Sequence, residues 1–169
     1  MTTPWTADDL PDQSGRTIVI TGASSGIGLA AARALIAKGA RVIAAVRNPA
    51  KARAVLGDSA DIRELDLANL DSVRRFAGDV DGNVDVLLNN AGVMAVPLAR
   101  TAQGFELQIG TNHLGHFALT GLLLPRITDR VVTVSSTAHR MGKIRLTDLN
   151  WERGYRRWAA YGQSKLANL

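Results

Sequence analysis

The chain of 169 residues contains no cysteine, so neither disulfide bonds nor thiolate metal sites can be invoked. It also lacks a long hydrophobic run. The most apolar stretch, FALTGLLLP at 117–125, is too short to span a bilayer and is interrupted by Gly121 and Pro125. The first sixteen residues, MTTPWTADDLPDQSGR, place acids and prolines where a signal peptide needs a basic and then an apolar segment. We therefore expect a cytoplasmic protein with no membrane partner.

The composition is that of a globular chain, with 46% hydrophobic and 21% charged residues. A chain of this length can bury one substantial core but is too short for two ordinary domains. It contains no internal repeat and no low-complexity linker. We therefore predict a single domain over 1–169.

The net charge is +5, and its densest basic group is RGYRRW at 153–158. Arginines that alternate with Tyr155 and Trp158 resemble the mixture of charge and stacking found in nucleic-acid sites. Nothing else in the chain extends this patch. The favoured interpretation is a solvent-exposed segment that leads into a helix and is anchored by the two aromatic residues. No nucleic-acid partner is expected.

Short apolar runs alternate with helical patterns along the chain. Runs rich in valine, isoleucine and leucine, apolar on both faces, are typical of strands in a buried parallel sheet. Four such strands are predicted, at 17–21, 41–46, 84–90 and 130–136, and the more alternating segment 61–67 reads as a fifth strand nearer an edge. Helices are predicted at 27–39, 70–80 and 101–124, the last one broken near Gly110. This alternation predicts an α/β fold with a Rossmann-type, doubly wound parallel sheet.

The glycine-rich segment TGASSGIG at 21–28 lies between the first strand and the first helix, which is the context that gives such a motif weight. Its glycines allow a sharp turn, a close approach to a pyrophosphate and close packing of the helix, while free N–H groups and the helix dipole attract the phosphates. The residues predicted to hold a dinucleotide here are Gly22, Ser24, Ser25, Gly26, Ile27 and Gly28. A phosphoryl-transfer loop would need Gly-Lys-Ser/Thr at the helix start, which this chain lacks.

The end of the second predicted strand, AAVRNP at 44–49, lacks a carboxylate. An NAD site usually has an aspartate or glutamate there to bind the ribose 2′-hydroxyl. Arg47 occupies this region instead, and a guanidinium suits a 2′-phosphate. We predict a preference for NADP(H) over NAD(H). The alternative is that Arg47 is merely an exposed residue at a strand end.

Six motifs in order resemble the short-chain dehydrogenase/reductase family across nearly the whole chain. They are TGASSGIG at 21–28, DL at 66–67, NNAG at 89–92, Asn112 within NHLGHF, VSS at 134–136 and YGQSK at 161–165. The segments NHLGHF, VSSTAHR and YGQSKLAN further resemble the retinol-dehydrogenase-like branch. The resemblance implies a strand order of 3-2-1-4-5 and hydride transfer between NADP(H) and a small-molecule carbonyl or alcohol.

The resemblance also implies roles for four catalytic residues. Tyr161 would be the general acid and base, and the ammonium of Lys165, four positions away, would favour its phenolate. Ser136 would hold the substrate oxygen, with Ser135 the less favoured candidate. Asn112 would belong to a proton relay that reaches Lys165. Tyr161 and Lys165 would also contact the cofactor.

Further cofactor contacts are implied at the carboxyl ends of the third and fourth strands. Asp66 and Leu67 would flank the adenine, while Asn89, Ala91 and Gly92 would lie along the cofactor. Ligands of open α/β sheets gather at these strand ends. In the family, helices near the tyrosine often form subunit contacts, so a homo-oligomer is also implied.

Each of these residue types has a plainer interpretation. Tyrosine and lysine four positions apart occur on many helices, a serine pair after a strand suits a turn, and Asn112 suits a helix cap. His113 and His116 share a helical face, but without a third ligand no metal site is predicted. The tyrosine, lysine, serine and asparagine occur together after a dinucleotide motif, and this joint occurrence favours their catalytic interpretation.

Family members are longer than this chain, and YGQSKLANL ends without a capping glycine. The resemblance implies two further strands and the loops that close over substrate. We therefore expect a fragment whose fifth strand is an exposed apolar edge, and which is itself weak or inactive as an enzyme. Two other functions stay open. One is a non-catalytic dinucleotide-binding or scaffolding module, and the other is an epimerase or dehydratase, whose motif is usually TGxxGxxG instead of the TGxxxGxG found here.

Overall fold

Five parallel strands form one central sheet in the order β3-β2-β1-β4-β5. The computed structural model describes residues 4–169. The strands are β1 (Thr17–Thr21), β2 (Arg41–Val46), β3 (Asp61–Glu64), β4 (Val84–Asn89) and β5 (Ile127–Thr133). The predicted α/β class, the parallel direction and the strand order are confirmed.

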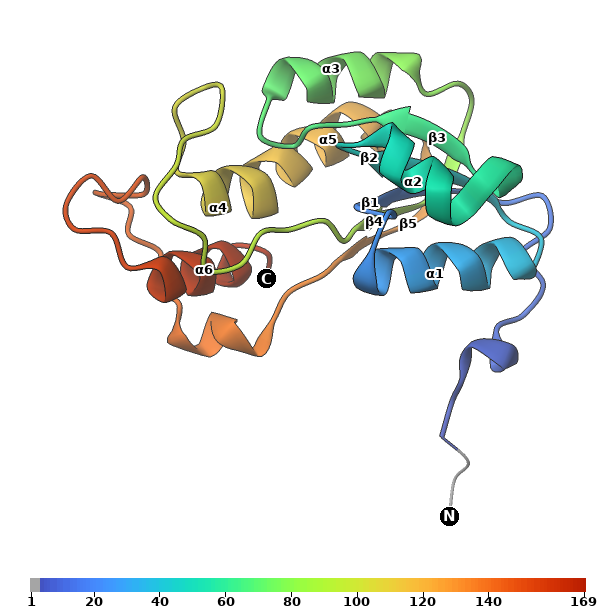
Figure 1. The fold of residues 1–169 in the computed structure, drawn as a ribbon, viewed down its shortest axis with the longest axis horizontal. Helices are drawn as coiled ribbons and strands as arrows, with labels where there is room; N and C mark the ends of the chain where they lie inside the picture. Colours follow the sequence, from blue (N-terminus) through green and yellow to red (C-terminus); the bar gives the residue numbers. More distant parts are fainter. Residues whose placement is uncertain (1–3) are drawn as a thin grey trace.

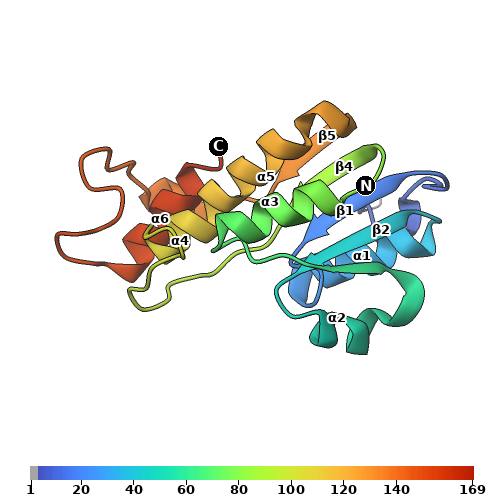
Figure 2. The same ribbon diagram turned by 90° about the horizontal axis from the view of Figure 1, so that it is seen from above.

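Helices cover both faces of this sheet (Figure 1). The α-helices of the described residues are α1 (Gly26–Ala37), α2 (Pro49–Leu56), α3 (Leu70–Asp79), α4 (Leu107–Ile109), α5 (Gly115–Leu123) and α6 (Arg157–Leu166). Helices α3 and α5 lie on one face and α1 on the other, while α4 and α6 lie beyond the carboxyl ends of the central strands (Figures 1 and 2). Among the helices within residues 4–169, none combines the length and the apolar character needed to cross a membrane.

Side chains alternate between two apolar cores along each central strand. Val19 and Ile43 pack on the face that also holds Phe76 of α3 and Leu119 of α5. Their neighbours in sequence face the other way, toward α1 and α2, as Ile20 does. Because both faces are covered, the strands read as continuous apolar runs instead of alternating ones.

The long predicted helix over 101–124 is only partly correct. Residues before Leu107 form a turn and an isolated bridge between Arg100 and Glu106, and the helix begins at Leu107. Near Gly110 the α-helical pattern is interrupted, as predicted, but the chain stays helical. A π-helical turn, Gly110–Leu114, leads directly into α5. A Cβ on Gly110 would lie 2.3 Å from Cγ2 of Thr101, so this glycine permits close packing and is not a helix stop.

One helix and several boundaries also differ from the sequence prediction. Helix α2 was not predicted, although Pro49 occupies its first turn and the Asn48 side chain caps it by accepting from the Lys51 N–H at 3.0 Å. Strand β3 ends at Glu64, and β5 runs from Ile127 to Thr133, so 134–136 lie beyond the sheet. These last residues are thereby free to line a site.

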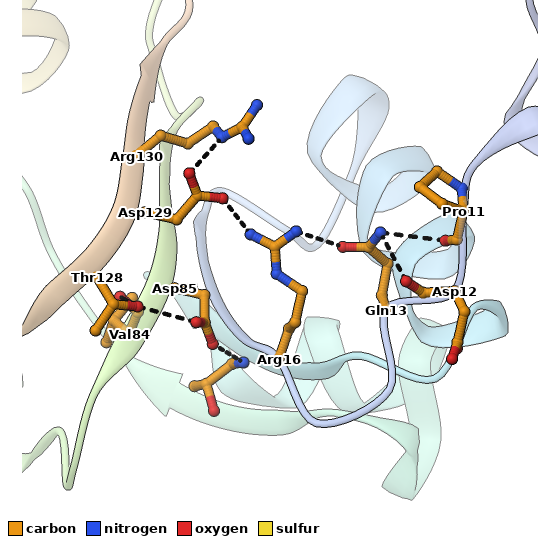
Figure 3. A network of polar contacts seen from close by, with 10 residues as sticks. Pro11, Asp12, Gln13, Arg16, Val84, Asp85, Thr128, Asp129 and Arg130 are labelled. Atoms are coloured by element: carbon orange, nitrogen blue, oxygen red, sulfur yellow. Dashed lines mark hydrogen bonds and ion pairs between the residues drawn. The ribbon is translucent and has the colours of Figure 1, made fainter.

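A polar network joins the amino ends of β1, β4 and β5 (Figure 3). Asp85 accepts from the Thr17 N–H at 2.8 Å and from the Thr128 hydroxyl at 2.9 Å, while Arg16 pairs with Asp129 on β5. As expected, β5 is an edge strand, and Val132 is 41% exposed on it.

Candidate functional site

A cleft of about 820 Å³ follows the carboxyl edge of the sheet. Residues directly after each of the five strands line it, beginning with Gly22 after β1 and ending with Ser136 after β5. Tyr161 and Lys165 of α6 line it from beyond the strand ends. Of the predicted site residues, the cleft brings together Gly22, Ser24, Ser25, Gly26, Ile27, Arg47, Asp66, Leu67, Ala91, Gly92, Ser136, Tyr161 and Lys165. Gly28, Asn89 and Asn112 do not line it.

The glycine-rich turn is shaped by left-handed backbone and by close contacts. Gly22 has φ +71° and Gly26 has φ +54°, a region that side chains rarely adopt. Gly28 is buried beneath the turn, where a Cβ would lie 2.4 Å from Nδ2 of Asn90 and 2.5 Å from the Gly22 carbonyl oxygen. The three glycines therefore fix the turn, open its surface and allow the start of α1 to approach β4.

One end of the cleft is basic. Arg47, directly after β2, is exposed and lines the cleft together with Asn48 and Lys51. Lys51 lies in the first turn of α2, where the helix dipole adds positive potential. Asp66 also lines the cleft, and one of its carboxylate oxygens accepts from the Ala68 N–H at 2.9 Å. This end of the cleft can receive an anionic group.

At the end of β4 the two asparagines take different positions. The Asn89 side chain is buried away from the cleft and donates to the Thr120 hydroxyl at 2.9 Å. Asn90 lines the cleft, and its amide donates to the Thr21 carbonyl at 2.9 Å. Because side chains alternate along an extended segment, adjacent positions face opposite sides.

Lys165 is buried beside Tyr161 at the other end of the cleft. Its Nζ donates to the Val134 carbonyl at 3.0 Å and lies 5.9 Å from the centroid of the Tyr161 ring. Burial lowers the pKa of the Lys165 ammonium from its ordinary value. Trp158 packs edge-on against Tyr161, with ring centroids 6.2 Å apart. Helix α6 therefore presents a phenol and an amine to one cleft.

The two serines after β5 differ in what their hydroxyls do. Ser135 donates its hydroxyl to the Lys165 carbonyl at 2.7 Å, which ties the strand end to α6. The Ser136 hydroxyl accepts from the Ala138 N–H at 3.2 Å and caps a short 3₁₀ turn, Thr137–Met141. Within residues 4–169 the Ser136 hydroxyl proton has no acceptor, so Ser136 retains a donor for a ligand.

Asn112 is fully buried in the π-helical turn and faces the loop after β4. Its Oδ1 accepts from the Val93 N–H at 2.8 Å, while its Nδ2 donates to the Val93 carbonyl and to the Ser164 hydroxyl, both at 2.9 Å. The side chain thus joins the Val93 loop to α6. A π-helical turn often marks a functional site.

His116 links this asparagine to the start of the glycine-rich turn. Its Nδ1 lies 3.0 Å from the Asn112 carbonyl, which can only accept, so Nδ1 carries the proton. Nε2, 2.8 Å from the Thr21 hydroxyl, must then accept. Burial lowers the pKa of His116 to about 4, which keeps the ring neutral. No group of three His, Asp or Glu side chains within residues 4–169 could hold a metal ion.

Comparison with known proteins identifies the family. The model of the family described as short chain dehydrogenase matches residues 16–168. The chain belongs to the short-chain dehydrogenase family. It is 45% identical to human retinol dehydrogenase 12 and 43% identical to mouse retinol dehydrogenase 14, in each case over 92% of this chain and 54% of the relative. The retinol-dehydrogenase-like resemblance is confirmed, and the chain spans about half the length of these curated relatives.

Solved structures give the same result for the fold. A crystal structure of an uncharacterized protein from Mycobacterium paratuberculosis has a TM-score of 0.95 and 62% identity, and the match covers 98% of this chain and 63% of that one. A short chain dehydrogenase from Shigella flexneri, solved in complex with NADP, has a TM-score of 0.72 and 28% identity. That match covers 92% of this chain and 68% of the Shigella chain.

Several cleft residues of this short-chain dehydrogenase were not predicted from its sequence, and the polar ones among them are Asn48, Lys51, Asn90 and Thr111. The first two follow Arg47 by one and four residues, so recognition of the α2 cap would have found them. Asn90 could have been predicted only if the direction of its side chain, toward the cleft, had been known. Thr111 carries a buried hydroxyl that has no partner within residues 4–169, which no sequence pattern signals.

Proposed function

We propose that this short-chain dehydrogenase transfers a hydride between NADP(H) and a carbonyl or alcohol substrate. The observation that carries the proposal is the single cleft that joins the glycine-rich turn to Ser136, Tyr161 and Lys165. The residues fit a dinucleotide, since side chains at Gly22 or Gly28 would close the turn against the loop after β4. When bound, the nicotinamide supplies or accepts the hydride.

The chain's own residues handle the proton and the substrate oxygen. In reduction, the Tyr161 hydroxyl donates its proton to the substrate oxygen as the carbon gains the hydride, and in oxidation the proton returns. The Lys165 ammonium stabilises the phenolate by its charge. Ser136 donates a hydrogen bond to the same substrate oxygen. Asn112 holds the Val93 loop and α6 in place, and this is the contribution that its contacts support.

Preference for NADP(H) is supported by the basic end of the cleft. Arg47 and Lys51 both line it, and the segment after β2 supplies no carboxylate for a ribose hydroxyl. A guanidinium forms strong, charge-assisted hydrogen bonds to a phosphate. We therefore assign Arg47 as the main contact of the 2′-phosphate and Lys51 as a second cation. A cytoplasmic location and a homo-oligomer belong to the same proposal.

Tyr161→Phe tests the reaction, because it removes the phenol and leaves the ring. In a version of the protein that spans the full length of its relatives, we expect NADPH-dependent reduction of a panel of aldehydes and ketones to fall by about 10²- to 10⁴-fold, the usual contribution of a general acid. NADPH affinity and thermal stability should change little. Tyr155→Phe is the comparison variant, because it removes the other tyrosine hydroxyl, which does not line the cleft, and should cost less activity than Tyr161→Phe.

An equal rate for the wild type and Tyr161→Phe would contradict the assignment. Cofactor binding without turnover in a full-length version of the protein would favour the alternative of a dinucleotide-binding module that is not an enzyme.

A further inference from the structure

A buried polar cluster lies behind the cleft wall, outside the residues assigned so far. It consists of Glu106, Gln108 and Tyr155, and it connects three segments that are distant in sequence. Glu106 and Gln108 are completely buried at the start of α4. Tyr155 comes from the segment that leads into α6. Buried polar groups are costly when unpaired, so each of these side chains needs hydrogen-bond partners. Those partners show which segments the cluster holds in place.

Gln108 uses its whole side-chain amide to join these segments. Its Oε1 accepts from the Ala95 N–H at 2.8 Å, in the loop that lines the cleft at Val93 and Met94. Its Nε2 donates to the Tyr155 hydroxyl and to the Arg157 carbonyl, both at 2.8 Å.

The Arg157 contact reaches the helix of the proposed general acid. Arg157 is the first residue of α6, and Tyr161 follows it by four residues, about one helical turn. The contact at Ala95 holds a strained residue, because Ala95 has φ +51°, a backbone region that is costly for a residue other than glycine. A conformation of this kind persists only where its surroundings hold it.

Glu106 fixes the backbone at Gln108, and Tyr155 contacts the Gln108 side chain. One oxygen of Glu106 accepts from the Gln108 N–H and the other from the Ile109 N–H, both at 2.9 Å. The Tyr155 hydroxyl lies 3.2 Å from Glu106 and donates to the Val96 carbonyl at 2.9 Å. Burial and the charge of Glu106 raise the pKa of Tyr155, so the phenol keeps its proton and remains a donor. Tyr155 thus holds the same loop one residue further along.

We propose that Gln108, held by Glu106 and Tyr155, is a positioning residue that sets the distance between the substrate-side wall at 93–96 and the helix that carries Tyr161. It touches neither cofactor nor substrate. Its effect on turnover rests on the function proposed above, whereas its effect on the loop does not. Loss of its amide should release both walls of the cleft while the dinucleotide end, at the glycine-rich turn and Arg47, stays unchanged.

Gln108→Leu tests this, because leucine has a similar size and no hydrogen bonds. Turnover should fall by about 100-fold, as expected when reacting groups are misplaced by about 1 Å, while the NADPH dissociation constant stays within about twofold. Tyr155→Phe, a milder variant, should cost about tenfold in turnover by the same reasoning. Gln13→Leu is the matched control, because Gln13 is also a buried glutamine but lies in the network at the opposite strand ends (Figure 3).

Amide hydrogen exchange measured by NMR supplies a readout that is independent of activity. In Gln108→Leu the Ala95 amide should exchange at least about tenfold faster, because its acceptor is gone. The Val93 amide should keep its rate, because it is held by Asn112 instead. This pair of amides separates loss of positioning from general loosening of the loop.

Unchanged exchange at Ala95, or a fall in turnover no larger than that of Gln13→Leu, would overturn the proposal. If a version of the protein that spans the full length of its relatives has no turnover at all, the proposed function fails. The exchange rates then decide the positioning role alone: acceleration confined to Ala95 supports it, and equal acceleration at Val93 contradicts it.

Discussion

Burial changes what individual ionisable groups can do in this domain. His116 is the sharpest case, because both of its ring nitrogens are engaged and its pKa is lowered to about 4. The Thr21 hydroxyl and the Asn112 carbonyl bond to the ring, and the charge of Lys165 acts on it. Of these groups, only the Asn112 carbonyl favours the protonated ring. The neutral ring thereby joins the glycine-rich turn to the π-helical turn.

This burial predicts a pH dependence of stability. The folded pKa of His116 lies below the ordinary 6.5, so the unfolded chain takes up the proton first and acid favours unfolding. The stabilisation is complete above about pH 6.5 and declines as pH falls toward 4. At about 1.4 kcal/mol per pKa unit, the contribution reaches about 3 kcal/mol.

Urea unfolding at pH 7 and at pH 4.5 measures this dependence. His116→Gln should lose less stability between the two pH values than the wild type, whereas the control His139→Gln should behave as the wild type does. The same pH dependence in His116→Gln as in the wild type would rule out a buried neutral histidine.

At the scale of elements, two helical glycines show opposite packing. Gly28 in α1 has no room for a methyl group, which would lie 2.4 Å from Asn90 and 2.5 Å from the Gly22 carbonyl. Gly78 in α3 has nothing within 4 Å of an added Cβ. Both would read as helix weakeners in sequence, so the difference comes entirely from what packs against them.

Gly28→Ala and Gly78→Ala therefore form a matched pair. We expect Gly28→Ala to lower the free energy of unfolding by about 1–3 kcal/mol through overpacking and to weaken NADPH binding. Gly78→Ala should raise stability by about 0.5–1 kcal/mol, because alanine is a better helix former. Denaturant titrations of both variants give the comparison, and a neutral Gly28→Ala would contradict the close approach of α1 to the loop after β4.

Most of the element types follow from the sequence, whereas several boundaries do not. The apolar runs of β1 and β2 predict their bounds correctly, because both faces of these strands are buried. The predicted break near Gly110 coincides with the change from α4 to the π-helical turn, but the chain stays helical there, and a contact with Thr101 from another segment explains the glycine. The different directions of Asn89 and Asn90, like the Gln108 cluster, depend on tertiary contacts that a linear pattern does not contain.

At the scale of the whole molecule, the carboxyl ends of the parallel strands all lie on one side of the sheet, and the cleft lies there. The charged network around Arg16 and Asp85 joins strands at their amino ends, on the opposite side (Figure 3). Stabilising contacts and ligand contacts are thus separated along the strands. Within the cleft, the basic end at Arg47 and the end at Tyr161 lie on different elements, as two parts of one extended ligand would require.

Calorimetric titration of NADPH and NADH into the wild type and Arg47→Asp tests this account most directly. We predict tighter binding of NADPH by the wild type, and a shift of about 10- to 100-fold toward NADH in Arg47→Asp, because a charge-assisted hydrogen bond contributes about 1.5–3 kcal/mol. Failure of the wild type to bind either dinucleotide, or an unchanged ratio of the two dissociation constants in Arg47→Asp, would contradict it.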